Sequence, residues 1–185
     1  MSRSMAQIYI SVGSNVDPEH SINQGMIALA DHFGMLMVSQ VYESEAVGFD
    51  GENFLNFVVG ASSERSPLEV AVVLRNIEDN CGRCRDAPRF SSRTLDLDLL
   101  LYDQEILDHV DLQLPRPEIT ENAFVLRPLA EIAGDAKHPL LGETYRELWR
   151  AYDQESQNLW PIPFTWPESV RHQLSECGRS HSPHP

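Results

Sequence analysis

An apolar run in the middle of the chain is interrupted by two carboxylates two positions apart, which limits the structures that it can adopt. The run reads Leu95-Asp96-Leu97-Asp98-Leu99-Leu100-Leu101-Tyr102. Successive side chains of a strand point to opposite faces, so a strand here places Asp96 and Asp98 together and the intervening leucines on the other face. Neighbouring carboxylates at the rim of a core repel each other and lose hydration, so they need a cation. The pattern predicts a strand whose carboxylates hold divalent metal ions or meet nearby guanidinium groups.

Arginine is concentrated before this run, in a chain that is otherwise acidic. The formal net charge of the 185 residues is −14, and Lys137 is the single lysine among 14 Lys+Arg residues. Five of the arginines lie in one short segment: Arg75, Arg83, Arg85, Arg89 and Arg93. A strongly acidic chain is a poor general binder of nucleic acid, but a local arginine cluster fits a small anion such as a polyphosphate. The alternative is that these side chains are solvated and that their number reflects genome composition.

Hydrophobic periodicity divides most of the chain into strands and helices. Helix patterns follow Pro18 and Pro67, and strand patterns cover residues 6–12, 35–42, 54–61 and 95–102. This order is typical of an α+β fold with a ferredoxin-like βαββαβ core, in which helices flank a largely antiparallel sheet. Two further helical patterns follow, at residues 124–132 and 144–152.

The length predicts one domain, and 42% hydrophobic residues is a globular composition. We expect a folded domain over residues 5–160 and a C-terminal extension over residues 161–185 that is largely disordered at its end. No apolar run is long enough to span a bilayer, and residues 1–5 precede a strand pattern rather than a signal-peptide pattern. We therefore expect a cytoplasmic monomer without nucleic-acid or membrane partners.

Two of the three cysteines form a Cys81-Gly82-Arg83-Cys84 motif. A redox-active dithiol or half of a zinc site is one interpretation of this spacing. The motif follows a helix pattern, however, and no second pair supplies the remaining zinc ligands. Reduced thiols are the favoured interpretation.

Six short motifs occur in a fixed order along the chain. They are Tyr9-Ile10-Ser11-Val12-Gly13-Ser14-Asn15, Tyr42 with Phe54-Leu55-Asn56, Arg83 with Arg85, Arg93-Thr94-Leu95-Asp96-Leu97-Asp98, Leu114-Pro115-Arg116-Pro117, and Phe124-Val125-Leu126 with Pro128-Leu129 and Glu131-Ile132. Together they resemble the 6-hydroxymethyl-7,8-dihydropterin pyrophosphokinase family of folate biosynthesis. The resemblance covers residues 8–132 and implies a ferredoxin-like fold. It also implies transfer of the pyrophosphoryl group of ATP to the hydroxymethyl oxygen of the pterin, giving AMP and the pterin diphosphate.

The resemblance further implies a role for each matching residue. Two Mg²⁺ ions would be held by Asp96 and Asp98, and the implied catalytic residues are Arg83, Arg93, Asp96 and Asp98. An amide and aromatic rings suit a flat heterocycle with polar edges, and the implied pterin contacts are Gly13, Ser44, Val47, Phe54, Asn56 and Phe124. The co-substrate ATP would contact Arg75, Glu78, Arg85, Arg89, Phe90, Leu99 and Arg116.

The chain departs from the family pattern at several polar positions. They are Ser44-Glu45-Ala46 in the pterin loop, Arg75 for a glutamine, Asp111 for a basic residue, Arg116 for a histidine and Asn122 for an arginine. Two alternatives to the pyrophosphokinase therefore stay open. One is a weakened pterin- or nucleotide-binding relative, or an enzyme for a modified pterin. The other is an unrelated Mg²⁺-dependent phosphohydrolase that uses Asp96 and Asp98.

Overall fold

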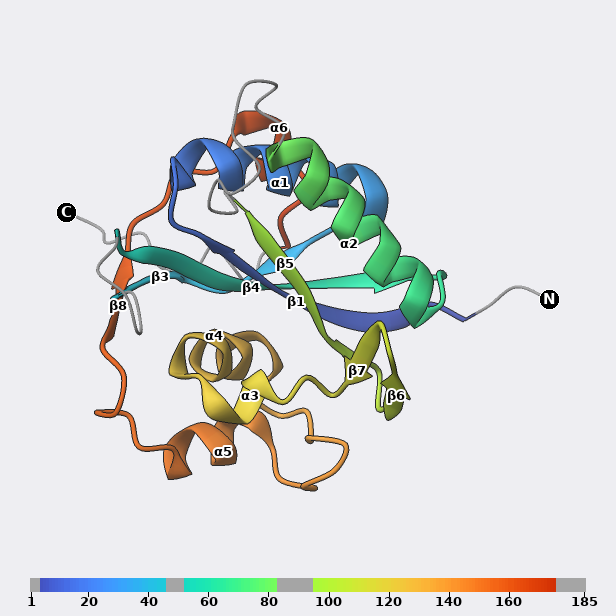
Figure 1. Cartoon of the computed structure of the whole chain (residues 1–185), viewed down its shortest axis with the longest axis vertical. Coiled ribbons are helices and arrows are strands. Elements are labelled where there is room, and N and C mark those ends of the chain that lie inside the picture. Colours follow the sequence, from blue (N-terminus) through green and yellow to red (C-terminus); the bar gives the residue numbers. More distant parts are fainter. Residues whose placement is uncertain (1–3, 46–51, 83–94, 176–185) are drawn as a thin grey trace.

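The computed structural model describes residues 4–45, 52–82 and 95–175, and a sheet runs through the middle of this part (Figure 1). Its strands are β1 (Ala6–Ser14), β2 (Met37–Val38), β3 (Val41–Ser44), β4 (Phe54–Ser63), β5 (Asp96–Tyr102) and β8 (Leu159–Ile162). The order across the sheet is β5-β1-β4-β3-β8, and β2 also pairs with β4. All of these pairings are antiparallel. A separate hairpin consists of β6 (Leu107–His109) and β7 (Leu112–Leu114).

Helices cover both faces of the sheet, so the molecule has three layers (Figure 1). One face carries α1 (Pro18–Phe33), α2 (Pro67–Gly82) and the short α6 (Glu168–Arg171). The other face carries α3 (Glu118–Glu121), α4 (Ala123–Ala133) and α5 (Tyr145–Ala151). None of the helices in the described residues combines the length and the apolar composition needed to cross a bilayer.

Apolar side chains pack on each face of the sheet in a separate cluster. The larger cluster joins the apolar stripes of α1 and α2 to the sheet and includes Ile8, Ile10, Ile22, Met26, Leu29, Val70, Leu74 and Ile77. The smaller cluster joins α4 and α5 to the sheet and includes Val58, Leu100, Leu101, Val125, Leu126, Leu129 and Tyr145. Packing on both sides fixes the sheet relative to α4, and the candidate site lies between these two elements.

A bulge in β5 explains how this strand serves both clusters. In the pairing with β1, Tyr9 lies opposite Leu101 and Ile10 lies opposite Leu99, so Leu100 is an extra residue. Before the bulge, the leucines that alternate with the aspartates (Leu95, Leu97 and Leu99) pack in the larger cluster, whereas Leu100 and Leu101 both pack in the smaller one. The aspartates therefore share a face with α4, away from α1 and α2.

The predicted combination of helices with a largely antiparallel sheet is confirmed, with local differences. The strand pattern at residues 35–42 forms two short strands, β2 and β3, with Ser39 between them. The Ser39 backbone N–H donates to the Val58 carbonyl (3.0 Å), but its hydroxyl oxygen accepts from the Val58 N–H (3.0 Å). A side-chain oxygen thus replaces a backbone acceptor and interrupts the ladder. The pattern also gave no indication of β8, which pairs with β3.

Candidate active site

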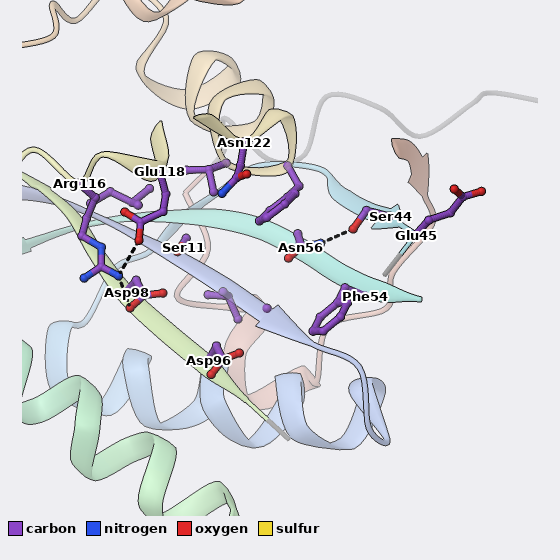
Figure 2. Close-up of a pocket in the computed structure, with 15 residues that line it drawn as sticks. Ser11, Ser44, Glu45, Phe54, Asn56, Asp96, Asp98, Arg116, Glu118 and Asn122 are labelled. Carbon is purple, nitrogen blue, oxygen red and sulfur yellow. Dashed lines mark hydrogen bonds and ion pairs between the residues drawn. The ribbon is translucent and has the colours of Figure 1, made fainter. Parts of the chain in front are cut away.

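A cavity of about 340 Å³ lies between the sheet and the beginning of α4 (Figure 2). Four strands, the segment before α4 and the first turn of α4 supply most of its lining. The lining residues are Ser11 and Gly13 of β1, Ser44 of β3 with the following Glu45, Phe54 and Asn56 of β4, Asp96 and Asp98 of β5, Arg116, Glu118 and Asn122 before α4, and Phe124 of α4. Strands from distant parts of the sequence meet here because β1 pairs with both β4 and β5. The cavity therefore combines carboxylates, amides and aromatic rings on a packed scaffold.

Gly13 separates the carboxylate side of the cavity from the amide side. In the register of the sheet, Gly13 pairs with Asp96 on one side and with Asn56 on the other. A Cβ atom added to Gly13 would lie 3.1 Å from Asn56 Oδ1, which is closer than an ordinary van der Waals contact. The absence of a side chain at this position therefore leaves room for the Asn56 amide.

The amide side of the cavity is held by a buried hydrogen bond. Asn56 Nδ2 donates to Ser44 Oγ at 2.9 Å, and the two residues are 8% and 6% exposed. This bond fixes the orientation of the amide and uses one of its two N–H groups. Phe54 lies opposite Ser44 in the register of β3 and β4 and lines the cavity together with Phe124. This side can therefore present directed polar atoms beside aromatic rings.

The carboxylate side is linked to the segment before α4 through one guanidinium group. Arg116 Nη2 lies 3.2 Å from Asp98 Oδ1 and 3.3 Å from Glu118 Oε1 (Figure 2). The side chain of Asp98 is 46% exposed, so it remains accessible from the cavity. Asp96 lines the same cavity, and both aspartates lie on the strand face that the alternating pattern predicted.

The two aspartates fit a divalent cation that is shared with a phosphate ligand. No cluster of three or more His, Cys, Asp and Glu side chains in the described part of the chain could enclose a metal ion. Mg²⁺ is commonly held by one or two carboxylates, while water and substrate phosphates fill its remaining positions. A pair of carboxylates that faces an open cavity matches this donor set.

Three of the predicted ATP contacts lie outside the lining of this cavity. Glu78 Oε1 accepts a hydrogen bond from the Leu97 N–H (2.7 Å), so it anchors the strand between the two aspartates. Arg75 is half exposed, and its Nη1 lies 4.0 Å from Asp111 Oδ1. Leu99 is 3% exposed and packs in the larger cluster, on the opposite face of β5. The structure brings together the other described residues of the predicted site: Gly13, Ser44, Phe54, Asn56, Asp96, Asp98, Arg116 and Phe124.

The remaining predicted residues lie outside the described part of the chain. They are Val47, Arg83, Arg85, Arg89, Phe90 and Arg93. The sequence motifs gave no role to two polar residues that line the cavity, Ser11 and Glu118. Ser11 was detectable, because it alternates with Gly13 along a predicted strand. Glu118 was not, because no motif marks it and its position depends on the path of the chain after Pro117.

Fold and cavity together define a class: an α+β protein with a small-molecule cavity over its sheet, lined by paired carboxylates and a fixed amide. Comparison with known families shows which family within this class the chain belongs to. Residues 9–134 match the model of the 7,8-dihydro-6-hydroxymethylpterin-pyrophosphokinase (HPPK) family, and the chain belongs to this family.

Curated relatives carry the corresponding enzyme name. The chain is 36% identical to 2-amino-4-hydroxy-6-hydroxymethyldihydropteridine pyrophosphokinase of Bacillus subtilis over 153 residues, which cover 80% of this chain and 91% of that protein. It is 33% identical to the protein of the same name from Aquifex aeolicus, over 77% of this chain and 90% of that protein.

Solved structures agree with the fold. The crystal structure of a Plasmodium falciparum HPPK-DHPS triple mutant matches 80% of this chain with a TM-score of 0.64 and 13% sequence identity. One structure of the wild-type protein, with SDX-DHP, gives a TM-score of 0.61 at 15% identity. The match covers 43% of each of those longer chains. At this identity the likeness establishes the fold alone, a mixed helix and antiparallel sheet structure.

Proposed function

We propose that this chain transfers the pyrophosphoryl group of MgATP to the hydroxymethyl group of 6-hydroxymethyl-7,8-dihydropterin. The products are AMP and the pterin diphosphate, as in the pyrophosphokinases to which the chain is related. The observation that carries the proposal is the composition of one cavity. It holds a carboxylate pair suited to a metal–phosphate complex and, across Gly13, an amide and aromatic rings suited to a heterocycle.

In this proposal the pterin lies on the amide side. Asn56 reads the polar edge of the ring, and the hydrogen bond from Asn56 Nδ2 to Ser44 Oγ holds the amide for this purpose before the substrate arrives. Phe54 and Phe124 contact the faces of the ring, where stacking adds to simple burial. Gly13 keeps the space between the pterin and the carboxylates open. Val47 is a further proposed contact.

In the proposed reaction, the hydroxymethyl oxygen of the pterin attacks the β-phosphorus of ATP. The bond between this phosphorus and the oxygen that bridges to the α-phosphate breaks, and AMP leaves with that oxygen. Asp96 and Asp98 would hold Mg²⁺, with a carboxylate accepting the hydroxyl proton. Bound at these carboxylates, two Mg²⁺ ions would neutralise phosphate charge and orient the reacting groups. Catalysis is then mainly positioning and electrostatic stabilisation.

Arginine side chains would hold the polyphosphate, because a guanidinium stays charged and offers a planar fork to oxyanions. Arg116 is the proposed arginine within the cavity. Arg83 and Arg93 are proposed catalytic contacts, and Arg85, Arg89 and Phe90 are proposed ATP contacts. Glu78 would support the nucleotide site through its hydrogen bond to the strand that carries the aspartates. Direct ATP contacts by Arg75 and Leu99 also remain part of the proposal.

We also propose the ferredoxin-like class for the core of the fold. The strand order β5-β1-β4-β3, with α1 after β1 and α2 after β4, supports this assignment. A monomer with its main domain at residues 5–160 is the accompanying proposal.

The test is AMP release from MgATP, measured with and without 6-hydroxymethyl-7,8-dihydropterin. Pterin-dependent AMP with an equal amount of pterin diphosphate is expected. Release of AMP or phosphate at the same rate with and without the pterin would instead identify a phosphohydrolase. Pterin binding without turnover would favour a weakened relative or a modified pterin as substrate. The second candidate is motivated by Arg116 and Asn122, since both departures from the family pattern line the cavity.

A further inference from the structure

Arg116 lies between two carboxylates in the wall of the cavity (Figure 2). Its Nη2 atom lies 3.2 Å from Asp98 and 3.3 Å from Glu118, so one nitrogen serves two acceptors. The Arg116 side chain is 27% exposed, which makes it the least exposed of the three. One guanidinium carries a single positive charge, so it neutralises two carboxylates only in part. If one carboxylate stops interacting with Arg116, the interaction of Arg116 with the other carboxylate can become stronger.

The second half of a stronger Arg116–Glu118 pair is present but unused. Arg116 Nε and Glu118 Oε2 are both buried, and neither has a hydrogen-bond partner among the described residues. In a two-pronged arginine–carboxylate pair, two guanidinium nitrogens face the two carboxylate oxygens. Nε with Nη2 on Arg116, and Oε1 with Oε2 on Glu118, are the atoms of such a pair. A small rotation of the guanidinium away from Asp98 would satisfy both buried atoms.

The backbone around these residues is anchored, so this exchange requires only side-chain motion. The Arg116 N–H donates to the carbonyl of Leu100, the bulged residue of β5, at 3.1 Å. The Arg116 carbonyl accepts from the Ile119 N–H at 3.2 Å, which places Glu118 inside a closed turn. Arg116 and Glu118 therefore keep their distance from the strand that carries Asp98.

We propose that Glu118 is a positioning residue that takes over Arg116 when Asp98 binds its divalent cation. The inference rests on the proposed function, because it needs a metal ion at Asp98. Without the cation, Arg116 neutralises Asp98 and spares it an uncompensated charge. With the cation, Arg116 turns to Glu118, leaves Asp98 free as a ligand and remains in the cavity as a phosphate contact. Loss of the Glu118 charge leaves Arg116 competing with the metal ion.

The test measures metal affinity directly. Mn²⁺ is titrated into the full chain with α,β-methylene-ATP, which cannot release AMP, and free Mn²⁺ is followed by electron paramagnetic resonance. Glu118→Gln should weaken Mn²⁺ binding about fivefold, the size expected for one partly exposed charge interaction. Glu45→Gln is the matched control. Glu45 lines the same cavity, and its Oε2 accepts a hydrogen bond from Asn158 Nδ2, at 3.5 Å. Less than a twofold change is expected there.

A second variant separates competition from simple loss of charge. Adding Arg116→Gln to Glu118→Gln removes the competitor. In a titration of wild type and both variants without nucleotide, where the phosphate contact of Arg116 plays no part, Mn²⁺ affinity of the double variant should return to within about twofold of wild type. Equal shifts in Glu118→Gln and Glu45→Gln, or no recovery in the double variant, would overturn the inference. The wild-type AMP assay tests the proposed function separately. Pterin-dependent AMP with unaltered Mn²⁺ binding in Glu118→Gln would leave the function standing and reject the role of Glu118.

Discussion

Gly13 lies where the two halves of the cavity meet, and its missing side chain has a measurable consequence. In Gly13→Ala, the new Cβ would press against Asn56 Oδ1 at 3.1 Å and shift an amide that Ser44 holds in place. We expect the pterin to bind about tenfold more weakly, because one directed hydrogen bond is disturbed. ATP affinity should change little. Titration calorimetry with each substrate measures both effects.

Gly60 offers a matched control for this substitution. A Cβ at Gly60 would lie 3.2 Å from the ring of Tyr9, a contact as tight as the one at Gly13 but outside the lining of the cavity. Gly60→Ala should therefore cost some stability and leave pterin affinity unchanged. Equal pterin affinity in the two variants would remove the proposed role of Asn56.

Asp98 gives the corresponding prediction on the carboxylate side. Asp98→Asn keeps the shape of the side chain and removes the charge that a metal ion needs. We expect AMP formation to fall at least about a hundredfold, as for the loss of one preorganised charge at a reacting phosphate. Because the side chain is 46% exposed, the melting temperature should hardly change. Asp108→Asn, on the exposed hairpin strand β6, is the control, and full activity in Asp98→Asn would exclude the metal assignment.

At the scale of elements, the connection between α4 and α5 is held by hydrogen bonds that His138 can accept only when its side chain is neutral. Its Nδ1 atom accepts hydrogen bonds from the N–H groups of Leu140 and Leu141, each at 3.2 Å. Only a neutral imidazole with an unprotonated Nδ1 can accept them. Burial also lowers the pKa of His138 below its ordinary value of 6.5. The folded state therefore binds a proton less readily at this residue than the unfolded chain does.

This difference fixes the sign of a pH effect on stability. Well above pH 6.5 the residue is neutral in both states, whereas around and below pH 6.5 the unfolded chain gains a proton that the folded chain resists. The contribution of His138 to the free energy of unfolding should be lost as the pH falls from 7 to 5. In His138→Asn, an amide oxygen can replace the acceptor without titrating. Denaturant unfolding at pH 7 and pH 5 measures how far the free energy of unfolding falls with pH. We expect this fall to be smaller by about 1 kcal/mol in His138→Asn than in the wild-type protein. An equal fall in both proteins would contradict the prediction.

Sequence patterns predicted some helices and strands of this fold but not the irregularities within the sheet. Alternation placed Asp96 and Asp98 on one strand face, and helical periodicity located α1 and α2, because both signals come from residues close in sequence. Two features of the sheet had no such signal. The break at Ser39 depends on a hydroxyl that meets Val58, and the bulge at Leu100 depends on the register with β1. Both are set by partners distant in the chain.

At the scale of the whole molecule, residues 159–174 return to the sheet and pack against it. Trp166 makes an edge-on contact with the buried Phe57, at 5.3 Å between ring centroids, and a tilted contact with Phe164 at 4.6 Å. Trp166→Ala should therefore lower the free energy of unfolding by about 2 kcal/mol. Trp160→Ala is the control, because Trp160 is 38% exposed, and it should cost less than about 1 kcal/mol. Denaturant titration compares the two variants, and equal losses would show that Trp166 does not anchor this segment.

The candidate site followed from the sequence only where motifs mark its residues. Asn56 and Phe124 lie in motifs and line the cavity, whereas Leu99 lies beside a motif and packs on the opposite face of the sheet. The family resemblance implied that Leu99 contacts ATP, whereas the alternating pattern of the strand placed Leu99 on the face of the core leucines. The link between Asp98 and Glu118 could not be foreseen, because Arg116 joins them only after the chain has turned back across β5.

The position of β8 has a consequence for how this protein behaves in a crowded solution. Without it, β3 would form the rim of the sheet, with unpaired backbone groups beside Ser44 and the cavity. Such a rim is a template on which a strand of another chain can add. β8 covers this rim of the sheet. Pro161 of β8, opposite Tyr42, has no backbone N–H with which a further strand could pair. The same short strand that completes the sheet therefore also covers the backbone of β3 beside Ser44, so that edge cannot pair with another chain.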